Sequence, residues 1–210
     1  MTSTARLSAL PSLGPARRLG LSVVRPEPAA RLGLEELQGR LCELRLQRDS
    51  LAYTRAIAWV REAQAAGEPA AWVTPPTHGF YPPDVQAHGV DLAALPVVRL
   101  APPVARLRAV DMLLRSGAFG LIVLDWEQQP PPPERILVRL VGLAKHHRTA
   151  LVGLTAHPQG LGGQVSLRLH PERAQEASGR YLCRLGVSKD KRGGPAERGP
   201  EVFSGPDGLY

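Results

Sequence analysis

Apolar and polar positions in the centre of the chain alternate between strand-like and helix-like patterns. Short apolar runs predict strands, and longer stretches with apolar residues three or four apart predict helices between them. The predicted strands are 39–45, 69–74, 97–100, 119–125, 150–155, 164–169 and 181–187. The predicted helices are 51–66, 83–88, 104–116 and 134–147. This alternation predicts an α/β fold with a mainly parallel sheet flanked by helices, and the last two strands predict a C-terminal antiparallel pair.

The start of this pattern has two interpretations. Leucines at helical spacing between positions 34 and 44 also allow a single helix over 34–66. Gly39 would cost that helix about 1 kcal/mol, which favours a strand followed by a helix. In that interpretation Asp49 or Ser50 is the expected N-cap of the helix, and Gly67 ends it.

The 210 residues fall into three parts that differ in composition. A chain of this length is expected to form one domain with tails. Residues 1–31 are rich in Ser, Pro, Arg and Ala, and their five arginines against one glutamate predict a basic, disordered arm. Residues 32–188 hold the regular pattern and form the expected core domain. Residues 189–210 are polar and rich in Gly and Pro, and predict a flexible basic tail.

The chain carries a net charge of +7, and all but three of its 26 basic residues are arginines. Such a composition favours contact with phosphate groups, although GC-rich codon usage explains it equally well. The chain has two cysteines, Cys42 and Cys183. Neither has another possible metal ligand at a suitable spacing, and two cysteines are too few for a disulfide framework. We therefore expect a reduced, cytoplasmic protein with no metal site, and the sequence predicts no signal peptide or membrane span.

One apolar strand ends on an acid, Asp125, at the close of the run Leu121–Leu124. A P-loop NTPase holds Mg²⁺ beside its nucleotide with an acid in this position. Such a strand accompanies a phosphate loop of the form G-x-x-x-x-G-K-[ST], and the chain contains no such motif. Half of an ATP site is therefore present in the sequence and the other half is missing.

Five short stretches carry a family resemblance through their order and spacing. They are 39–44, 62–68, 89–95, 115–125 and 185–195, the last containing Lys189-Asp190-Lys191. They resemble the RecA ATPase core, and more closely its catalytically degraded relatives, the ImuA and SulA-like proteins of bacterial DNA-damage mutagenesis. The resemblance covers about residues 32–195 and implies a RecA-like core of the P-loop NTPase type.

The resemblance places 46–54 where RecA has its phosphate loop, and here the chain departs from the family. The segment has none of the glycines that let backbone N–H groups face phosphates, and Ala52 or a neighbour stands in the place of the lysine. The glutamate that activates water falls at Pro76 or Thr77. Three residues remain as a degenerate nucleotide site: Asp125, Ser50 and Thr54. The resemblance thus implies no catalytic residues and no ATP hydrolysis, with ATP and Mg²⁺ binding weak or absent.

The two DNA-binding loops of RecA correspond to 127–133, which is mostly proline here, and to 156–163, which keeps only a Gly-Gly remnant. A RecA-style grip on single-stranded DNA is therefore not expected. The resemblance also matches Lys189 and Lys191, with Arg192 beside them, to lysines that reach the ATP of a neighbouring RecA subunit. These residues are candidates for docking onto RecA, and a solvated basic turn is the alternative.

Two further pairs are candidate partner or DNA contacts. Lys145 and Arg148 lie at the end of a predicted helix, where the alternative is simple compensation of the helix dipole. Phe80 and Tyr81 lie in a proline-rich loop, whereas Trp72 is expected in the core.

The function implied by the resemblance is a non-enzymatic adaptor in the SOS response. It would link RecA to a Y-family-like polymerase subunit of the ImuB type and to an error-prone replicative-type polymerase. Contact with DNA would be indirect, and the protein would associate with the nucleoid after damage. Three alternatives stay open: a RecA-type DNA-dependent ATPase with a divergent phosphate loop, a SulA-like cell-division inhibitor, and a basic DNA-binding protein.

Overall fold

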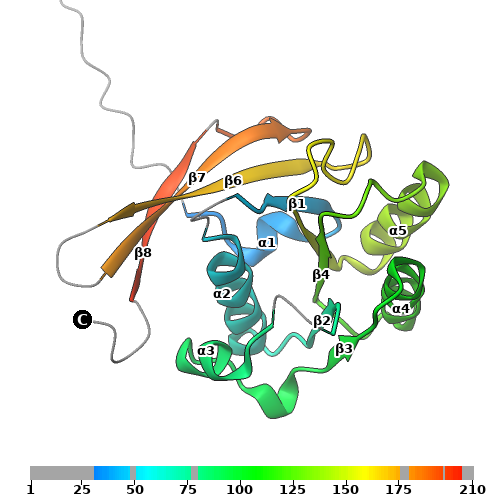
Figure 1. Cartoon of the computed structure of the whole chain (residues 1–210), viewed down its shortest axis with the longest axis horizontal. Coiled ribbons are helices and arrows are strands. Elements are labelled where there is room, and N and C mark those ends of the chain that lie inside the picture. The colour runs from blue at the N-terminus through cyan, green and yellow to red at the C-terminus, as the bar shows by residue number, and fades with distance from the viewer. Residues whose placement is uncertain (1–30, 48–50, 77–79, 176–179, 196, 205–210) are drawn as a thin grey trace, which may run out of the picture.

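The computed structural model describes residues 31–47, 51–76, 80–175, 180–195 and 197–204. Within these residues the chain forms one eight-stranded sheet of order β3-β2-β4-β5-β1-β6-β7-β8 (Figure 1). The strands are β1 (Leu41–Arg45), β2 (Ala70–Thr74), β3 (Val97–Arg99), β4 (Leu121–Glu127), β5 (Ala150–Thr155), β6 (Leu167–Gln175), β7 (Arg180–Asp190) and β8 (Glu197–Ser204). The helices are α1 (Leu34–Leu37), α2 (Ala52–Ala65), α3 (Pro82–Ala87), the 3₁₀ turn η1 (Leu92–Ala94), α4 (Pro103–Ser116) and α5 (Glu134–His147).

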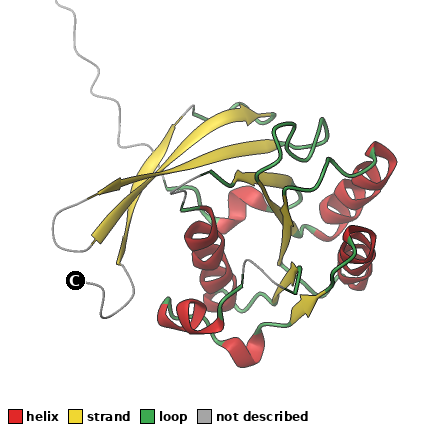
Figure 2. Ribbon diagram, viewed as in Figure 1, coloured by secondary structure: helices red, strands yellow, loops and turns green. Residues whose placement is uncertain are grey.

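Helices cover both faces of the parallel part of the sheet (Figure 2). Strand β4 shows why the strands are apolar throughout. Leu121 and Val123 pack on the side of α2, while Ile122 and Leu124 pack on the side of α4 and α5. Since both faces of such a strand are buried, neither side tolerates polar residues in its interior.

The sequence predicted this architecture. Strands β1 to β6 pair in parallel, and β6 with β7 is the expected antiparallel pair. The alternative of one helix over 34–66 is wrong, because Gly39 adopts a φ of +67° and separates the short α1 from β1. Gly67 and Gly117 also have positive φ and follow α2 and α4, as C-terminal glycines do. The N-cap position of α2 is Leu51, while Asp49 and Ser50 lie outside the described residues.

The expectation of a flexible tail after Ser188 is wrong for much of that segment. Strand β7 continues to Asp190, and β8 adds an eighth strand by pairing antiparallel with β7. Ion pairs with the core hold β8 although its composition is polar. Arg198 contacts Glu36 over 2.8 Å, and Glu201 contacts the buried Arg55 over 2.6 Å. The proposed basic arm over residues 1–31 lies outside the described residues except for Arg31, and so does the segment 205–210.

The parallel strands define two edges of the sheet. At the carboxyl edge lie the ends of β1, β2, β4 and β5, including Asp125. At the amino edge lie the starts of these strands, the end of α5 and the turn between β7 and β8. Arg40, just before β1, contacts Asp190 at the end of β7, which joins the antiparallel strands to this edge.

The two cysteines, Cys42 and Cys183, are free and buried. In the part of the chain that the structure describes, no cluster of three or more His, Cys, Asp or Glu residues is arranged to hold a metal ion. Nor is any described helix long and apolar enough to cross a membrane.

Candidate functional site

Strand β4 delivers Asp125 to the carboxyl edge, where the side chain is fully buried. Two hydroxyl groups donate to the same carboxylate oxygen, Oδ2: that of Tyr53 over 3.0 Å and that of Thr74 over 3.3 Å. The other oxygen, Oδ1, is buried without a hydrogen-bond partner among the described residues. Burial raises the pKa of Asp125 to about 6, against the lowering effect of the bond from Tyr53. The acid is therefore held by side chains of its own domain.

Aromatic side chains pack beside this acid. The ring of Tyr53 stacks on Trp72 with ring centres 6.5 Å apart, and Phe80 meets Trp72 edge-on at 5.4 Å. Trp72 is buried, as predicted. Phe80 is also buried, with 8% of its surface exposed, so its assignment as an accessible partner contact is wrong. Its ring completes the packing around Trp72, whereas Tyr81 is 63% exposed and remains available.

The position of Tyr53 has a counterpart in the phosphate-loop motif. If Ala52 stands at the lysine of G-x-x-x-x-G-K-[ST], Tyr53 stands at the Ser or Thr that holds Mg²⁺ together with the strand acid. In this chain the same two positions are joined directly by a hydrogen bond. Sequence reasoning singled out Ser50 and Thr54 instead. Ser50 lies outside the described residues, and Thr54 shares the first turn of α2 with Tyr53.

The segment 156–163, which the family resemblance matches to the second DNA-binding loop of RecA, is packed into the domain. Leu161 is buried, and its backbone N–H donates to the carboxylate of Glu43 over 2.8 Å. Arg45 at the end of β1 donates to the carbonyl of His157 over 2.6 Å. These contacts tie the segment to β1. At the other loop the indole N–H of Trp126 donates to the carbonyl of Pro130 over 2.9 Å, which anchors the proline run.

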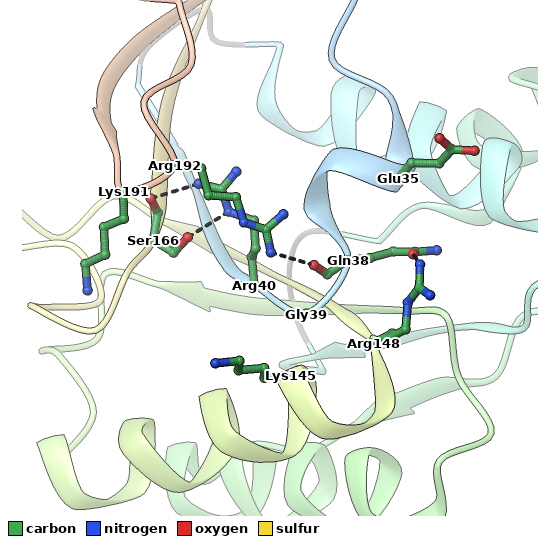
Figure 3. Close-up of a pocket in the computed structure, with 9 residues that line it drawn as sticks. All are labelled: Glu35, Gln38, Gly39, Arg40, Lys145, Arg148, Ser166, Lys191 and Arg192. Atoms are coloured by element: carbon green, nitrogen blue, oxygen red, sulfur yellow. Dashed lines mark hydrogen bonds between the residues drawn. The ribbon is translucent and has the colours of Figure 1, made fainter.

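A second candidate site lies at the amino edge of the sheet, in a hollow of about 500 Å³ (Figure 3). Among the described residues that line it, five are cationic and one is acidic: Arg40, Lys145, Arg148, Lys191, Arg192 and Glu35. They come from the start of β1, the end of α5, the turn after β7 and helix α1. The fold thus brings together two groups that sequence reasoning treated separately, namely the pair Lys145 and Arg148 and the pair Lys191 and Arg192.

Sequence reasoning missed Arg40, which lines this hollow and connects the start of β1 to the end of β7. Its guanidinium is buried and forms an ion pair with Asp190, and it donates to the hydroxyl of Ser166 over 2.7 Å. Burial alone would raise the pKa of Asp190, but the N–H groups of Arg192 and Gly194 and the Arg40 guanidinium hold it below its usual value. The one sequence signal was an arginine directly after Gly39, at the start of an apolar strand.

The two lysines proposed for RecA docking contact the same backbone carbonyl group. Lys189 and Lys191 donate to the carbonyl oxygen of Gly163 over 3.0 and 3.3 Å. Burial lowers the pKa of Lys189, and the neighbouring charge of Lys191 adds to this effect. Two like charges are therefore held close together at the surface, an arrangement that an anion would stabilise.

Comparison with known proteins finds partial similarity to RecA. The chain is 39% identical over 88 residues to Protein RecA of Corynebacterium jeikeium (strain K411), a match that covers 42% of this chain and 23% of that protein. It is 38% identical over 88 residues to Protein RecA of Mycolicibacterium vanbaalenii, covering 42% of this chain and 25% of that protein. No family model matches the chain. The chain is thus RecA-like over part of its length, and the match spans about a quarter of the curated relatives.

Proposed function

We propose that the protein is a non-catalytic, RecA-like adaptor of the ImuA type, which links RecA to an error-prone translesion polymerase assembly in the SOS response. The observation that carries the proposal is the hydrogen bond from Tyr53 to Asp125. If Ala52 stands at the lysine of the phosphate-loop motif, this bond joins the two positions between which a phosphate-loop ATPase holds its metal ion. The strand acid is retained, but it serves the packing of the domain.

The loss of the remaining catalytic parts supports the same proposal. Phosphoryl transfer depends on electrostatic stabilisation by a lysine, by backbone N–H groups of a glycine-rich loop and by a metal ion. The segment 46–54 lacks those glycines, and Ala52 supplies no charge. We therefore propose that the protein neither hydrolyses ATP nor needs it to fold.

The face that we assign to RecA docking contains Lys189 and Lys191. A subunit that offers this face, without an ATP site of its own, can join one end of a RecA assembly and cannot extend it. The paired ammonium groups beside Gly163 would meet the phosphates bound by the adjacent RecA subunit. Tyr81, at the start of α3, is exposed and is available for a second partner such as a polymerase subunit of the ImuB type.

A RecA capture assay tests the docking face. Purified RecA, with ATP and without it, is passed over the immobilised protein and over two single-charge-reversal variants. Lys189→Glu is expected to abolish ATP-dependent capture. Arg108→Glu, an equal change at an exposed position of α4, should leave capture intact. Equal capture by all three proteins would contradict the proposed docking face.

A nucleotide titration tests the non-catalytic assignment. Magnesium ATP is expected to leave the melting temperature unchanged, because a ligand stabilises only a protein that binds it. A clear upward shift, or turnover of ATP on single-stranded DNA, would favour a RecA-type ATPase instead. Binding to the tubulin-like division protein without binding to RecA would favour a SulA-like inhibitor.

A further inference from the structure

We propose that the amino edge of the sheet carries a binding groove for the phosphate backbone of single-stranded nucleic acid. This groove lies at the edge opposite Asp125. Of the two segments matched to the DNA loops of RecA, 127–133 contributes no residue to its lining, and 156–163 reaches it at Gly163, whose carbonyl accepts from Lys191. It is built from the hollow shown in Figure 3 and from two hollows that adjoin it.

The lining of the three hollows is continuous, because each outer hollow shares residues with the central one. A hollow of about 170 Å³ shares Arg40 and Arg192 with the central one. A hollow of about 380 Å³ on the other side shares Gln38 and Arg148 with it. A compact ligand would fill the central hollow alone, whereas a chain of phosphate groups can follow all three. The continuity therefore favours an extended polyanion.

The central hollow keeps a positive charge after its internal contacts are counted. Arg40 is neutralised by Asp190. The other two guanidinium groups donate to neutral oxygens: Arg192 to the carbonyls of Glu36 and Gln38, and Arg148 to the side-chain amide oxygen of Gln38 over 2.9 Å. These bonds orient the guanidinium groups, but they cancel no charge.

Lys145 is the cation best placed to accept a ligand. It is exposed, and its ammonium group has no acceptor among the described residues. The C-terminal end of α5 lies here, and its helix dipole repels an anion with the equivalent of about half a negative elementary charge. Lys145, Arg148, Lys191 and Arg192 outweigh both that dipole and the single carboxylate of Glu35.

The adjoining larger hollow favours a single strand over a duplex. Its lining includes Phe119, which also packs against the core, and His147, whose ring meets that of His146 edge-on with ring centres 4.6 Å apart. Aromatic and imidazole faces bind unstacked bases, while duplex bases are not free to stack on them. The groove thus combines cations with Phe119 and His147. Its outer hollows also contain carboxylates: Glu68 on one side, and on the other Glu36 and Asp190, which pair with Arg198 and Arg40.

The test compares two double variants that remove the same charge. The first combines Lys145→Ala with Lys191→Ala and removes two exposed ammonium groups from the groove. Arg108→Ala with Arg135→Ala removes two exposed charges from α4 and α5 outside the groove. Binding of a fluorescent thymidine oligomer of about 12 nucleotides is measured by anisotropy over a range of salt concentrations. Melting temperatures confirm that both variants fold.

The wild-type chain is expected to bind the oligomer with strong salt dependence. The groove variant should lose about tenfold in affinity near 0.1 M salt, and the slope of log affinity against log salt should fall by about 1.4, about 0.7 for each lost phosphate contact. The control variant should change the slope far less. Equal losses in the two variants would show diffuse charge attraction and overturn the groove.

Two further comparisons identify which kind of nucleic acid the groove binds. A uridine oligomer compared with the thymidine oligomer separates RNA from DNA, and tighter binding of either one supports the groove. Tighter binding of a duplex of equal length would overturn the single-strand assignment. The assay contains no RecA, so a negative result here leaves the docking proposal intact.

Discussion

The hydroxyl group of Tyr53 lies 3.0 Å from Oδ2 of Asp125 and joins the first turn of α2 to the end of β4. Asp125 is buried and Tyr53 is partly buried. Burial raises the pKa of Tyr53 well above its usual value, and the charge of Asp125 adds to the effect. A buried carboxylate is costly unless hydrogen bonds satisfy it. The tyrosine therefore compensates for an acid that the fold retains at this edge.

Tyr53→Phe should destabilise the protein without creating a nucleotide site. The change leaves the hydroxyl of Thr74 as a donor to Asp125, and loss of a hydrogen bond to a buried charged group costs about 2 kcal/mol. Urea unfolding near neutral pH measures this change. The replacement keeps the ring that stacks on Trp72, so an unchanged unfolding midpoint would mean that the hydrogen bond contributes nothing.

Stability should fall as the pH rises from about 4 to about 6, because of Asp125. Its pKa is about 6 in the folded protein against 3.8 for an ordinary aspartate. The folded state therefore binds more protons than the unfolded state in this window, and rising pH favours unfolding. Asp125→Asn removes the titrating group, so this part of the pH dependence should disappear. The difference is measured by urea midpoints at several pH values.

Tyr53→Phe provides the matched control for the pH experiment. Loss of a donor to the carboxylate should raise the pKa of Asp125 further and move the window to higher pH. A pH profile that Asp125→Asn leaves unaltered would assign the titration to another group.

The fold was predictable wherever the pattern was local. The predicted helix 134–147 matches α5, and the strand 150–155 matches β5, because each has a clear period and a clear end. Strand β8 was not predictable, since its residues Glu197–Ser204 are mainly polar and are held by distant partners. Arg55, which pairs with Glu201, lies 146 positions earlier in the chain.

In the candidate site, too, the residues marked by a local pattern were predictable and the others were not. Asp125 was identifiable because an apolar strand ends on it. Tyr53 was not, since a motif search looks for Ser or Thr after the lysine and does not select a tyrosine. The cations of the central hollow come from three chain segments that meet only in the folded state. Lys145 and Lys191 were recognisable as basic residues, but their common hollow with Arg40 was not.

Gly160→Ala should destabilise the protein through the packed segment after β5. Gly160 has a φ of +62°, which disfavours residues with a side chain, and an added methyl group would collide with the carboxylate of Glu43. The combined strain and overpacking should cost about 2 to 4 kcal/mol. Gly163→Ala is the control, since its Cβ meets open space at an ordinary φ and should change stability by less than about 0.5 kcal/mol. Similar urea midpoints for the two variants would show that the segment does not pack as described.

Glu201→Ala tests whether β8 is an integral part of the domain. Glu201 pairs with Arg55, whose side chain is fully buried, lies over the ring of Trp59 at 4.5 Å and donates to the carbonyl of Leu32 over 2.5 Å. Removal of the carboxylate leaves the buried guanidinium without its closest counter-charge, and the loss should reach about 3 kcal/mol.

The control for this variant lies on the same strand. Val202 is 51% exposed, so Val202→Ala should change the stability by less than about 0.5 kcal/mol. Glu201→Gln, which keeps the shape and removes the charge, should give an intermediate loss. Because the pair joins β8 to α2, Glu201→Ala should also speed hydrogen exchange along β8 more than along β4. If the three variants unfold at the same urea concentration as the wild-type protein, the ion pair does not secure β8 to the core.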